Sequence, residues 1–408
     1  MKLIYNIGIG VYNLLIFIVS FFSEKAELWI AGRKDWKSQL DFLKGEKVIW
    51  IHAASLGEFE QGKPIIDQLY DDDNGCKILL TFFSPSGYQI RKSYKKADLV
   101  MYLPLDSPRN SRYFVSNLNL EMAIFIKYEF WFNFLNQLYL NNIQTVFISV
   151  IFREDHLFFK WWGKWFFNHL KRISKFFVQN EASKKILKEK GITNIEVAGD
   201  TRFDAVCATQ KLAQRNNLVE AFLQGKQCVI FGSTWDKDHD LIVPFINKYK
   251  TDNVKFIIAP HEIKVDELKL LSKDLKGRVV NYLDNNSEGD IMIINTIGIL
   301  KHLYQYAIVS YIGGGFGAGI HNTLEAAVQN QFVVFGPEFY KFQEAKDLIE
   351  NGTGVSISNQ SEFEVALRKV IEDDQFRKDM VVKSQEFIAS NRGASTKILQ
   401  YINTQLNS

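Results

Sequence analysis

The chain has 408 residues, of which 47% are hydrophobic and 23% are charged, so it is neither disordered nor fibrous, and its length predicts two or three domains. Its 49 Lys and Arg residues nearly balance its 46 Asp and Glu residues, and the formal net charge of +3 gives no strong field for binding nucleic acid. The three cysteines form no CxxC pair, which argues against a disulfide framework or a zinc site and fits a reducing compartment.

The first predicted element is an apolar segment at the N-terminus. Residues 3–22 carry no charge, and a helix of that length just spans the hydrocarbon core of a bilayer. Asn6, Asn13 and two glycines interrupt it, so a helix lying in the membrane interface is one alternative. A cleaved signal peptide is another, although residues 20–23 offer no small-x-small cleavage site. Basic residues follow the segment more often than they precede it, which predicts a membrane anchor over 1–23 with the rest of the chain in the cytoplasm.

Beyond this segment, short apolar runs alternate with amphipathic stretches of helical length, as in a parallel sheet with helices on both faces. The first series of runs comprises residues 47–52, 77–81, 123–126, 145–150, 176–179 and 196–199. A polar helical stretch over 204–224 separates it from runs at 227–231, 254–259, 279–282, 291–294, 307–311 and 332–335. We therefore expect an α/β protein with two doubly wound, Rossmann-like domains, 24–204 and 205–408, facing a cleft, with ligands at the carboxyl ends of the strands.

Two glutamates follow strands of the first domain. The first strand leads through HAASLG to Glu58, at the start of a helix, and the strand over 123–126 leads through Lys127 and Tyr128 to Glu129. Two carboxylates at neighbouring strand ends can converge on one hydroxyl, one as general base and the other as the group that orients it. The alternative for each is a capping carboxylate that complements a helix dipole.

A glycine-rich loop follows the strand over 307–311 in the second domain. Gly313, Gly314 and Gly315 begin the run GGGFGAG, and glycines there let backbone amides approach a phosphate. A dinucleotide site would also require an acid at the end of the next strand, which instead ends FGP, so an NAD site is not expected. Glu325, one turn into the following helix, is placed to accept both ribose hydroxyls of a nucleotide.

Two shorter turns support a nucleotide site in this half. Gly232, Ser233 and Thr234 follow the domain's first strand and offer hydroxyls and amides to an anion, and Pro260 with His261 follows the second strand. Either turn alone is equally typical of an ordinary polar loop. Their shared position at strand ends is what favours a binding role.

No metal site is predicted. The pattern from Asp236 to Asp240 contains an Asp-x-Asp pair, but these carboxylates are expected to cap a helix, and DDDNG at 71–75 is typical of a solvated turn. The histidines show no ligand spacing, and no G-x-S-x-G elbow is present.

Residues 157–177 combine aromatic and basic side chains. At helical spacing they predict a face that suits a lipid headgroup interface, and the alternative is a helix that packs on the domain with its lysines extended to solvent. The residues that we expect at the membrane or lipid acceptor are Lys160, Trp161, Trp162, Lys164 and Trp165.

Taken together, these segments resemble the 3-deoxy-D-manno-octulosonic acid (Kdo) transferases, a family of GT-B glycosyltransferases. The matching motifs, in family order, are WIHAASLGE at 50–58, YLPLD at 102–106, EFW at 129–131, GDTRFD at 199–204, GST at 232–234 and HNTLE at 321–325. The sequence departs from the family where Pro260-His261 lacks an intervening Arg, where residues 295–300 read NTIGIL, and where 126–129 read IKYE.

The resemblance implies an inverting, metal-independent transfer of Kdo from CMP-Kdo to the lipid A precursor (lipid IVA), at the cytoplasmic face of the inner membrane, with no cofactor. It implies catalytic roles for Glu58 and Glu129. The donor-binding residues it implies are Gly232, Ser233, Thr234, Pro260, His261, Gly298, Gly313, Gly314, Gly315, Asn322 and Glu325. One alternative is another GT-B glycosyltransferase with a UDP-sugar donor and a lipid acceptor. A second is a membrane-tethered nucleotide sensor without catalytic activity.

Overall fold

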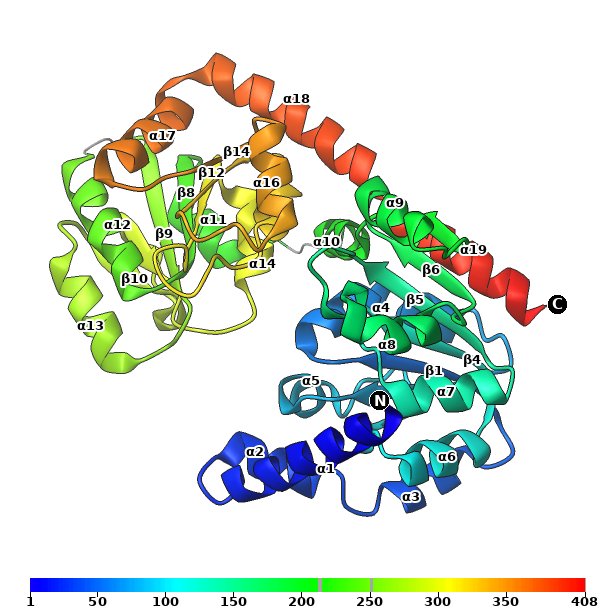
Figure 1. Cartoon of the computed structure of the whole chain (residues 1–408). Helices are drawn as coiled ribbons and strands as arrows, with labels where there is room; N and C mark the ends of the chain where they lie inside the picture. Colours follow the sequence, from blue (N-terminus) through cyan, green and yellow to red (C-terminus); the bar gives the residue numbers. More distant parts are fainter. Residues whose placement is uncertain (212–214, 250–251, 408) are drawn as a thin grey trace. The chain divides into compact units, whose positions relative to one another are not determined.

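The chain forms two compact units in a computed structural model that describes residues 1–211, 215–249 and 252–407 (Figure 1). Unit 1 comprises Met1–Ala205 and Arg392–Ser408, and unit 2 comprises Val206–Asn391. The sequence-based division assigned 392–408 to the second domain, and the structure corrects it. Helix α19 (Ala394–Leu406) buries Ala394, Ile398 and Ile402 in the core of unit 1, against α4 (Leu56–Asp71).

Unit 1 is built on a parallel seven-stranded sheet of order β3-β2-β1-β4-β5-β6-β7. Its strands are β1 (Lys47–Ala53), β2 (Lys77–Phe82), β3 (Leu99–Tyr102), β4 (Asn119–Ile126), β5 (Gln144–Val150), β6 (Lys175–Val178) and β7 (Ile195–Val197). Its other helices are α1 (Lys2–Val19), α2 (Glu24–Ala31), α3 (Trp36–Gln39), η1 (Leu40–Leu43), α5 (Pro85–Arg91), α6 (Pro108–Ser116), α7 (Phe132–Leu140), η2 (Leu157–Phe159), η3 (Trp161–Gly163), α8 (Lys164–Leu170) and α9 (Glu181–Glu189). Helix α10 (Thr201–Lys211) contains the division between the units.

Helices cover both faces of this sheet, which explains why its strands are almost continuously apolar. Along β1, Val48 and Trp50 point into a core shared with α3, α6, α7, α8 and α9. Ile49 and Ile51 point into the opposite core, shared with α4 and α19. The period of two that alternates side chains across a strand therefore divides the apolar residues between two layers.

Unit 2 repeats this plan with a parallel sheet of order β10-β11-β9-β8-β12-β13-β14. Its strands are β8 (Gln227–Thr234), β9 (Val254–Pro260), β10 (Val279–Asn281), β11 (Ile291–Ile293), β12 (Val309–Ile312), β13 (Phe332–Phe335) and β14 (Gly354–Ser356). Its helices are α11 (Asn217–Leu223), α12 (Asp236–Lys248), α13 (Val265–Asp274), η4 (Tyr282–Asp284), α14 (Leu300–Leu303), η5 (Tyr304–Tyr306), α15 (Leu324–Ala327), α16 (Gln343–Glu350), α17 (Gln360–Glu372) and α18 (Asp374–Asn391).

Each sheet reverses its strand order at one place. In unit 1 the chain winds outward from β1 through β2 and β3, then returns to the other side of β1 with β4. In unit 2 the corresponding reversal lies between β8 and β12. Ligands of doubly wound proteins bind beyond the carboxyl ends of the strands at such a switch point. The glutamates and glycines selected from the sequence lie at the carboxyl ends of these four strands or directly after them.

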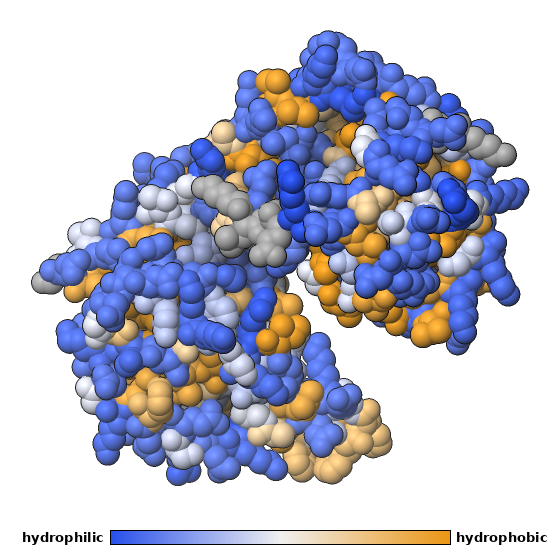
Figure 2. Space-filling model, turned by 180° about the vertical axis from the view of Figure 1, so that it is seen from behind, coloured by the Kyte–Doolittle hydropathy of each residue, from blue (hydrophilic) through white to orange (hydrophobic). Residues whose placement is uncertain are grey.

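Helix α1 is apolar and lies on the surface of unit 1. Among the described residues it is the one helix long and apolar enough to cross a membrane, and none of its side chains is fully buried. Figure 2 shows apolar surface at the lower right of the view, at the end of unit 1 formed by α1 and α2. The exposed large side chains of this segment include Leu3, Ile4, Ile7, Val11, Leu14, Leu15, Phe17, Ile18, Phe21 and Phe22.

Candidate active site

Glu58 lies where the first strand of unit 1 enters its helix. Ser55 is the extended N-cap residue of α4, and its hydroxyl donates to Glu58 Oε2. The ammonium of Lys127, which directly follows β4, lies 3.6 Å from Glu58 Oε1. Lys127 holds a left-handed backbone, with φ of +62°, a conformation that side chains other than glycine adopt rarely. The ends of β1 and β4 therefore meet at this carboxylate.

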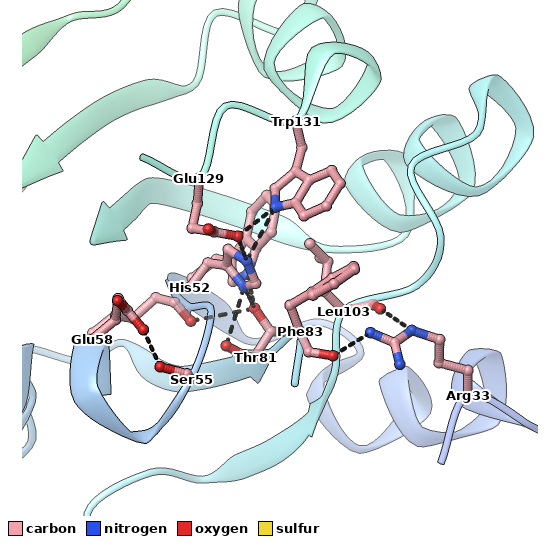
Figure 3. Close-up of polar contacts among 11 residues, drawn as sticks. Arg33, His52, Ser55, Glu58, Thr81, Phe83, Leu103, Glu129 and Trp131 are labelled. Carbon is pink, nitrogen blue, oxygen red and sulfur yellow. Dashed lines mark hydrogen bonds and ion pairs between the residues drawn. The ribbon is translucent and has the colours of Figure 1, made fainter. Parts of the chain in front are cut away.

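Glu129 is held by two ring nitrogens. The indole Nε1 of Trp131 donates to Glu129 Oε2 over 2.9 Å, and Nε2 of His52 lies 3.1 Å from the same oxygen (Figure 3). A carboxylate only accepts hydrogen bonds, so Nε2 carries the imidazole proton. The indole Nε1 of Trp131 also lies 3.3 Å from His52 Nε2. Because both of these nitrogens then carry a hydrogen, the indole donates to the nearer Glu129 oxygen and not to His52.

A buried chain of hydrogen bonds fixes the His52 ring. His52 is fully buried in β1, and its Nδ1 lies 2.9 Å from the hydroxyl of Thr81 on the adjacent strand β2. The same hydroxyl accepts from the indole Nε1 of Trp50 over 2.8 Å. Nδ1 also lies 3.1 Å from the carbonyl oxygen of Thr81, so Thr81 contacts the ring through both its hydroxyl and its backbone, while Nε2 donates to Glu129. The second carboxylate is oriented by side chains of the sheet itself.

The two glutamates therefore differ in their partners. Figure 3 shows both at the same edge of the sheet, with His52 between them in this view. Among the described residues, Glu129 is paired with the ring nitrogens of Trp131 and His52, whereas Glu58 is paired with a serine hydroxyl and the ammonium of Lys127. One carboxylate can take up a proton, and one held by ring nitrogens can accept a further hydrogen bond from a hydroxyl and hold it in place. This arrangement suits activation of a hydroxyl nucleophile.

The sequence reasoning gave no role to His52, Trp131, Thr81 or Lys127. His52 and Trp131 occur within the quoted motifs, and alternation along β1 places His52 on the same face as Trp50. Only strand pairing places Thr81 beside them.

Residues 232–234, expected to form a turn after the strand, are the last three residues of β8, and they lie beside the loop after β12 in unit 2. The amide of Gly313 donates to the carbonyl of Gly232 over 2.9 Å. A Cβ on Gly313 would lie 2.4 Å from the carbonyl oxygen of Ser233, and one on Gly315 would lie 2.6 Å from Cα of Gly336. Close packing of the backbone therefore requires glycine at these positions, whether or not a phosphate approaches the loop.

Asp238 ties the glycine loop to the start of α12. It is buried, and it accepts hydrogen bonds from the amides of Trp235 and Gly314 and from the hydroxyl of Tyr311, over 2.8, 2.9 and 2.6 Å. The amides of Gly317 and Gly319 donate to the carbonyl of Gly314. Four amides of the predicted phosphate loop, counting that of Gly313, thus have partners inside the protein. The Asp-x-Asp pattern caps a helix, and among the described residues no cluster of three His, Cys, Asp or Glu side chains could hold a metal ion.

Three aromatic rings stack at the same edge of unit 2. The ring of His261 lies 4.7 Å from that of Trp235 and 4.1 Å from that of His321, all nearly parallel. Trp235 Nε1 donates to His321 Nε2 over 2.9 Å. Burial, together with the nearby His261, lowers the pKa of His321 to about 4, so this ring is neutral at physiological pH. A partly exposed stack of rings can bind the flat face of a nucleobase.

Glu325 approaches this region from α15. Asn322 Nδ2 donates to Glu325 Oε1 over 3.1 Å. Burial, and then the charge of Glu325, raise the pKa of the Tyr304 phenol well above its usual value, and that phenol packs against Gly232. Gly298 stands apart in an exposed loop, where no heavy atom lies within 4 Å of a Cβ built on it. The turn at 232–234, His261, the glycine loop and Glu325 come together, while Gly298 does not join them by a direct contact.

The aromatic segment over 157–177 is not one continuous amphipathic helix. It forms two short 3₁₀ turns and α8, and Phe158, Phe159 and Phe166 pack against the core of unit 1. Trp165 is half-buried against Phe132 and Tyr5, whereas Trp161 is 88% exposed and Lys160 and Lys164 are exposed. The side chain of Trp162 lies outside the described part of the structure. The expected aromatic face is therefore largely directed inward, and one tryptophan with two lysines remains at the surface.

Comparison with known proteins identifies relatives of both units. Residues 34–205 match the family described as 3-deoxy-D-manno-octulosonic-acid transferase (kdotransferase). A protein of that name from Rickettsia bellii is 27% identical over 371 residues, covering 87% of each chain. Its counterpart from Aquifex aeolicus is 25% identical over 342 residues, covering 82% of this chain and 88% of the relative.

Among solved structures, the fold resembles UDP-GlcNAc 2-epimerase from Neisseria meningitidis. That structure has a TM-score of 0.64 at 14% identity, covering 88% of this chain and 100% of the epimerase. The epimerase from Methanocaldococcus jannaschii gives a TM-score of 0.55 at 16% identity, covering 80% of this chain and 91% of the epimerase. These likenesses concern the fold alone. They confirm the predicted GT-B fold class of two Rossmann-like units.

Proposed function

We propose that this chain, which belongs to the 3-deoxy-D-manno-octulosonic acid transferase family, moves Kdo from CMP-Kdo to the lipid A precursor lipid IVA. The observation that carries the proposal is the pair of carboxylates, Glu58 and Glu129, at the switch point of the first sheet. Both lie within the residues that match the family, and their surroundings suit activation of a hydroxyl.

In the proposed reaction a hydroxyl of the acceptor attacks the anomeric carbon of Kdo. Glu58 takes the proton of that hydroxyl, the new bond to carbon forms, and the bond from carbon to the phosphate oxygen of CMP breaks. One displacement inverts the configuration at that carbon. Glu129, held by Trp131 and His52, accepts a hydrogen bond that orients the acceptor, and the ammonium of Lys127 lies beside the carboxylate of Glu58.

The donor belongs to unit 2 in this proposal. The stack of Trp235, His261 and His321 takes the cytosine face, and Glu325 accepts the ribose hydroxyls. Because Gly313 and Gly314 use their amides internally and the Thr234 hydroxyl is paired with His239, the phosphate relies on the hydroxyl of Ser233 and on other loop amides. The leaving group is a single phosphate, whose charge such donors can stabilise, so the proposed reaction requires no metal ion.

The site of action is the cytoplasmic face of the inner membrane. Support comes from the exposed apolar surface of α1 and from Trp161, Lys160 and Lys164 on the same unit. Helix α1 is also attached to the body of unit 1, since Tyr5 donates to the buried carboxylate of Asp106 over 2.6 Å. This attachment favours a helix that lies along the membrane interface.

The deciding experiment incubates the detergent-solubilised full chain with CMP-Kdo and lipid IVA. Mass spectrometry should detect lipid IVA carrying added Kdo, and NMR should show the anomeric configuration opposite to that of the donor. EDTA should leave the rate unchanged. Transfer from UDP-GlcNAc with no reaction from CMP-Kdo would overturn the proposal.

A further inference from the structure

Arg33 is a partly buried cation whose hydrogen bonds go to backbone carbonyls. Its guanidinium donates to the carbonyls of Trp29, Phe83 and Leu103 over 2.9, 2.8 and 2.8 Å, and lies 3.7 Å from the centre of the Trp29 ring. No carboxylate pairs with it in the part of the chain that the structure describes. Burial lowers its pKa to about 9, so it remains charged at neutral pH. One side chain thus joins the end of α2 to the loops that follow β2 and β3.

Phe83, whose carbonyl Arg33 holds, has aromatic neighbours on two sides. The ring of Trp131 is stacked on it at 4.8 Å with an interplanar angle of 30°. The ring of Tyr12, from the apolar helix α1, is stacked on it at 6.2 Å and 24°. Tyr12 also meets the edge of Trp29 at 6.0 Å. Aromatic contacts therefore run from α1 through Phe83 to Trp131.

This series of contacts ends at the catalytic pair. Trp131 is the residue whose indole donates to Glu129, and its ring orientation determines where that donor points. Figure 3 shows Arg33 and Phe83 on one side of Trp131, and Glu129 with His52 on the other. The peptide from Glu129 to Trp131 lies in the loop between β4 and α7, where side-chain contacts must supply the rigidity.

We propose that α1 is a structural part of the acceptor site as well as a membrane helix. Tyr12, Phe83 and Trp131 form a positioning stack, held by Arg33, that fixes the indole donor and thereby the Glu129 carboxylate. The proposal rests on the function proposed above, because it assigns the stack to the same transfer reaction. It makes Tyr12 and Arg33 positioning residues, since neither touches the carboxylate.

The test compares Tyr12→Leu, Tyr12→Phe, Trp131→Phe and the double variant Tyr12→Leu/Trp131→Phe. Each is assayed as the full chain in detergent micelles with CMP-Kdo and lipid IVA, so attachment to a bilayer plays no part. We expect Tyr12→Leu to lower kcat about tenfold with the KM for CMP-Kdo unchanged, because a small displacement of a positioned group is costly. Tyr12→Phe, which keeps the ring, should retain the wild-type kcat.

The double variant separates positioning from general stability. If Tyr12 acts through the indole, Tyr12→Leu should change kcat less than twofold once Trp131 is Phe, so the two effects are not additive. Phe17→Leu is the matched control, because Phe17 lies on the same helix and its ring meets Phe21 instead of Phe83. It should retain the wild-type rate. Phe83→Leu replaces Tyr12→Leu if the latter fails to fold.

Three results would overturn the inference while leaving the proposed function intact. These are a wild-type kcat in folded Tyr12→Leu, additive effects in the double variant, or an equal loss in Phe17→Leu. If the wild-type chain itself transfers no Kdo from CMP-Kdo, the proposed function fails and the inference fails with it.

Discussion

Asp238 and Gly314 are joined by a hydrogen bond of 2.9 Å from the glycine amide to Oδ2 of the aspartate, across 76 residues of chain. The same buried carboxylate accepts from Tyr311 and from the amide of Trp235. Three donors from two strand ends thus converge on one side chain. The glycine loop owes its position to this carboxylate.

Replacing Asp238 by Ala should destabilise the chain by about 2–4 kcal/mol, because it leaves buried donors without an acceptor. Urea unfolding of both proteins measures the difference. Asp240→Ala is the control, since Asp240 is exposed on the same helix and should change stability little. Equal stability of Asp238→Ala and wild type would show that the carboxylate does not hold the loop.

Gly315→Ala should disrupt the donor site, whereas Gly317→Ala should be tolerated. An added Cβ would lie 2.6 Å from Gly336 in the first case, and 3.6 Å from its nearest neighbour in the second. We expect Gly315→Ala to weaken CMP binding at least tenfold, because an overpacked loop must shift its backbone. Isothermal titration with CMP provides the measurement. Similar affinities in the two variants would contradict the role of close packing.

Glu58→Gln should lower kcat by about 10²–10⁴-fold with CMP binding preserved, since an amide cannot accept the proton of the acceptor. Glu60→Gln is the matched control two residues away, because Glu60 pairs with Arg91. Its rate should stay close to that of wild type. A Glu58→Gln enzyme with the wild-type rate would exclude Glu58 as the base.

His321 should make stability sensitive to acid. Its pKa is lowered to about 4 in the folded protein, below the ordinary value of 6.5, so the unfolded chain binds the proton first as pH falls. The contribution of the neutral His321 ring to the free energy of unfolding is fully present above pH 6.5. It is lost as the pH falls from about 6.5 to about 4. His321→Phe should therefore lose less stability than wild type over that range, as measured by urea unfolding at each pH. Parallel pH dependences would show that this ring does not contribute.

Lys160 and Lys164 should contribute to binding of anionic membranes. The variant Lys160→Ala/Lys164→Ala should bind anionic vesicles about tenfold more weakly, because each lysine near the surface adds electrostatic attraction. Binding to zwitterionic vesicles should be unchanged, and vesicle flotation measures both. A loss that is equal for both vesicle types would exclude an electrostatic contribution.

Most of the strands were predicted from apolar periodicity, and the strands that were missed share a physical feature. The runs chosen from the sequence coincide with twelve strands, from β1 at Lys47–Ala53 to β13 at Phe332–Phe335. The two strands that were missed, β3 and β14, lie at sheet edges and have four and three residues. A short edge strand is only half enclosed and can lack the continuous apolar signal of a central strand, although β7 and β10, which are also three-residue edge strands, coincide with predicted runs.

The candidate site was predicted less completely. Glu58 and Glu129 follow strands, and strand ends can be located from sequence. The pairing of Glu129 with His52 cannot be located from sequence, because His52 lies 77 positions away. Thr81, which fixes the His52 ring, belongs to a third strand. The glycine loop was interpreted as a source of free amides, whereas Asp238 already occupies the amide of Gly314.

The sequence by itself determined two α/β units, an apolar N-terminal segment and the resemblance to the Kdo transferases, because these depend on local periodicity and on motifs that are continuous along the chain. Only the tertiary structure decided which groups hold the two candidate carboxylates, that the last helix joins unit 1, and that the aromatic segment at 157–177 turns mostly inward. The physical reason is that hydrogen bonds and ring contacts act over a few ångströms in space. Their partners here are separated by up to hundreds of residues in sequence, as in the bond from the amide of Gly393 to Asp204.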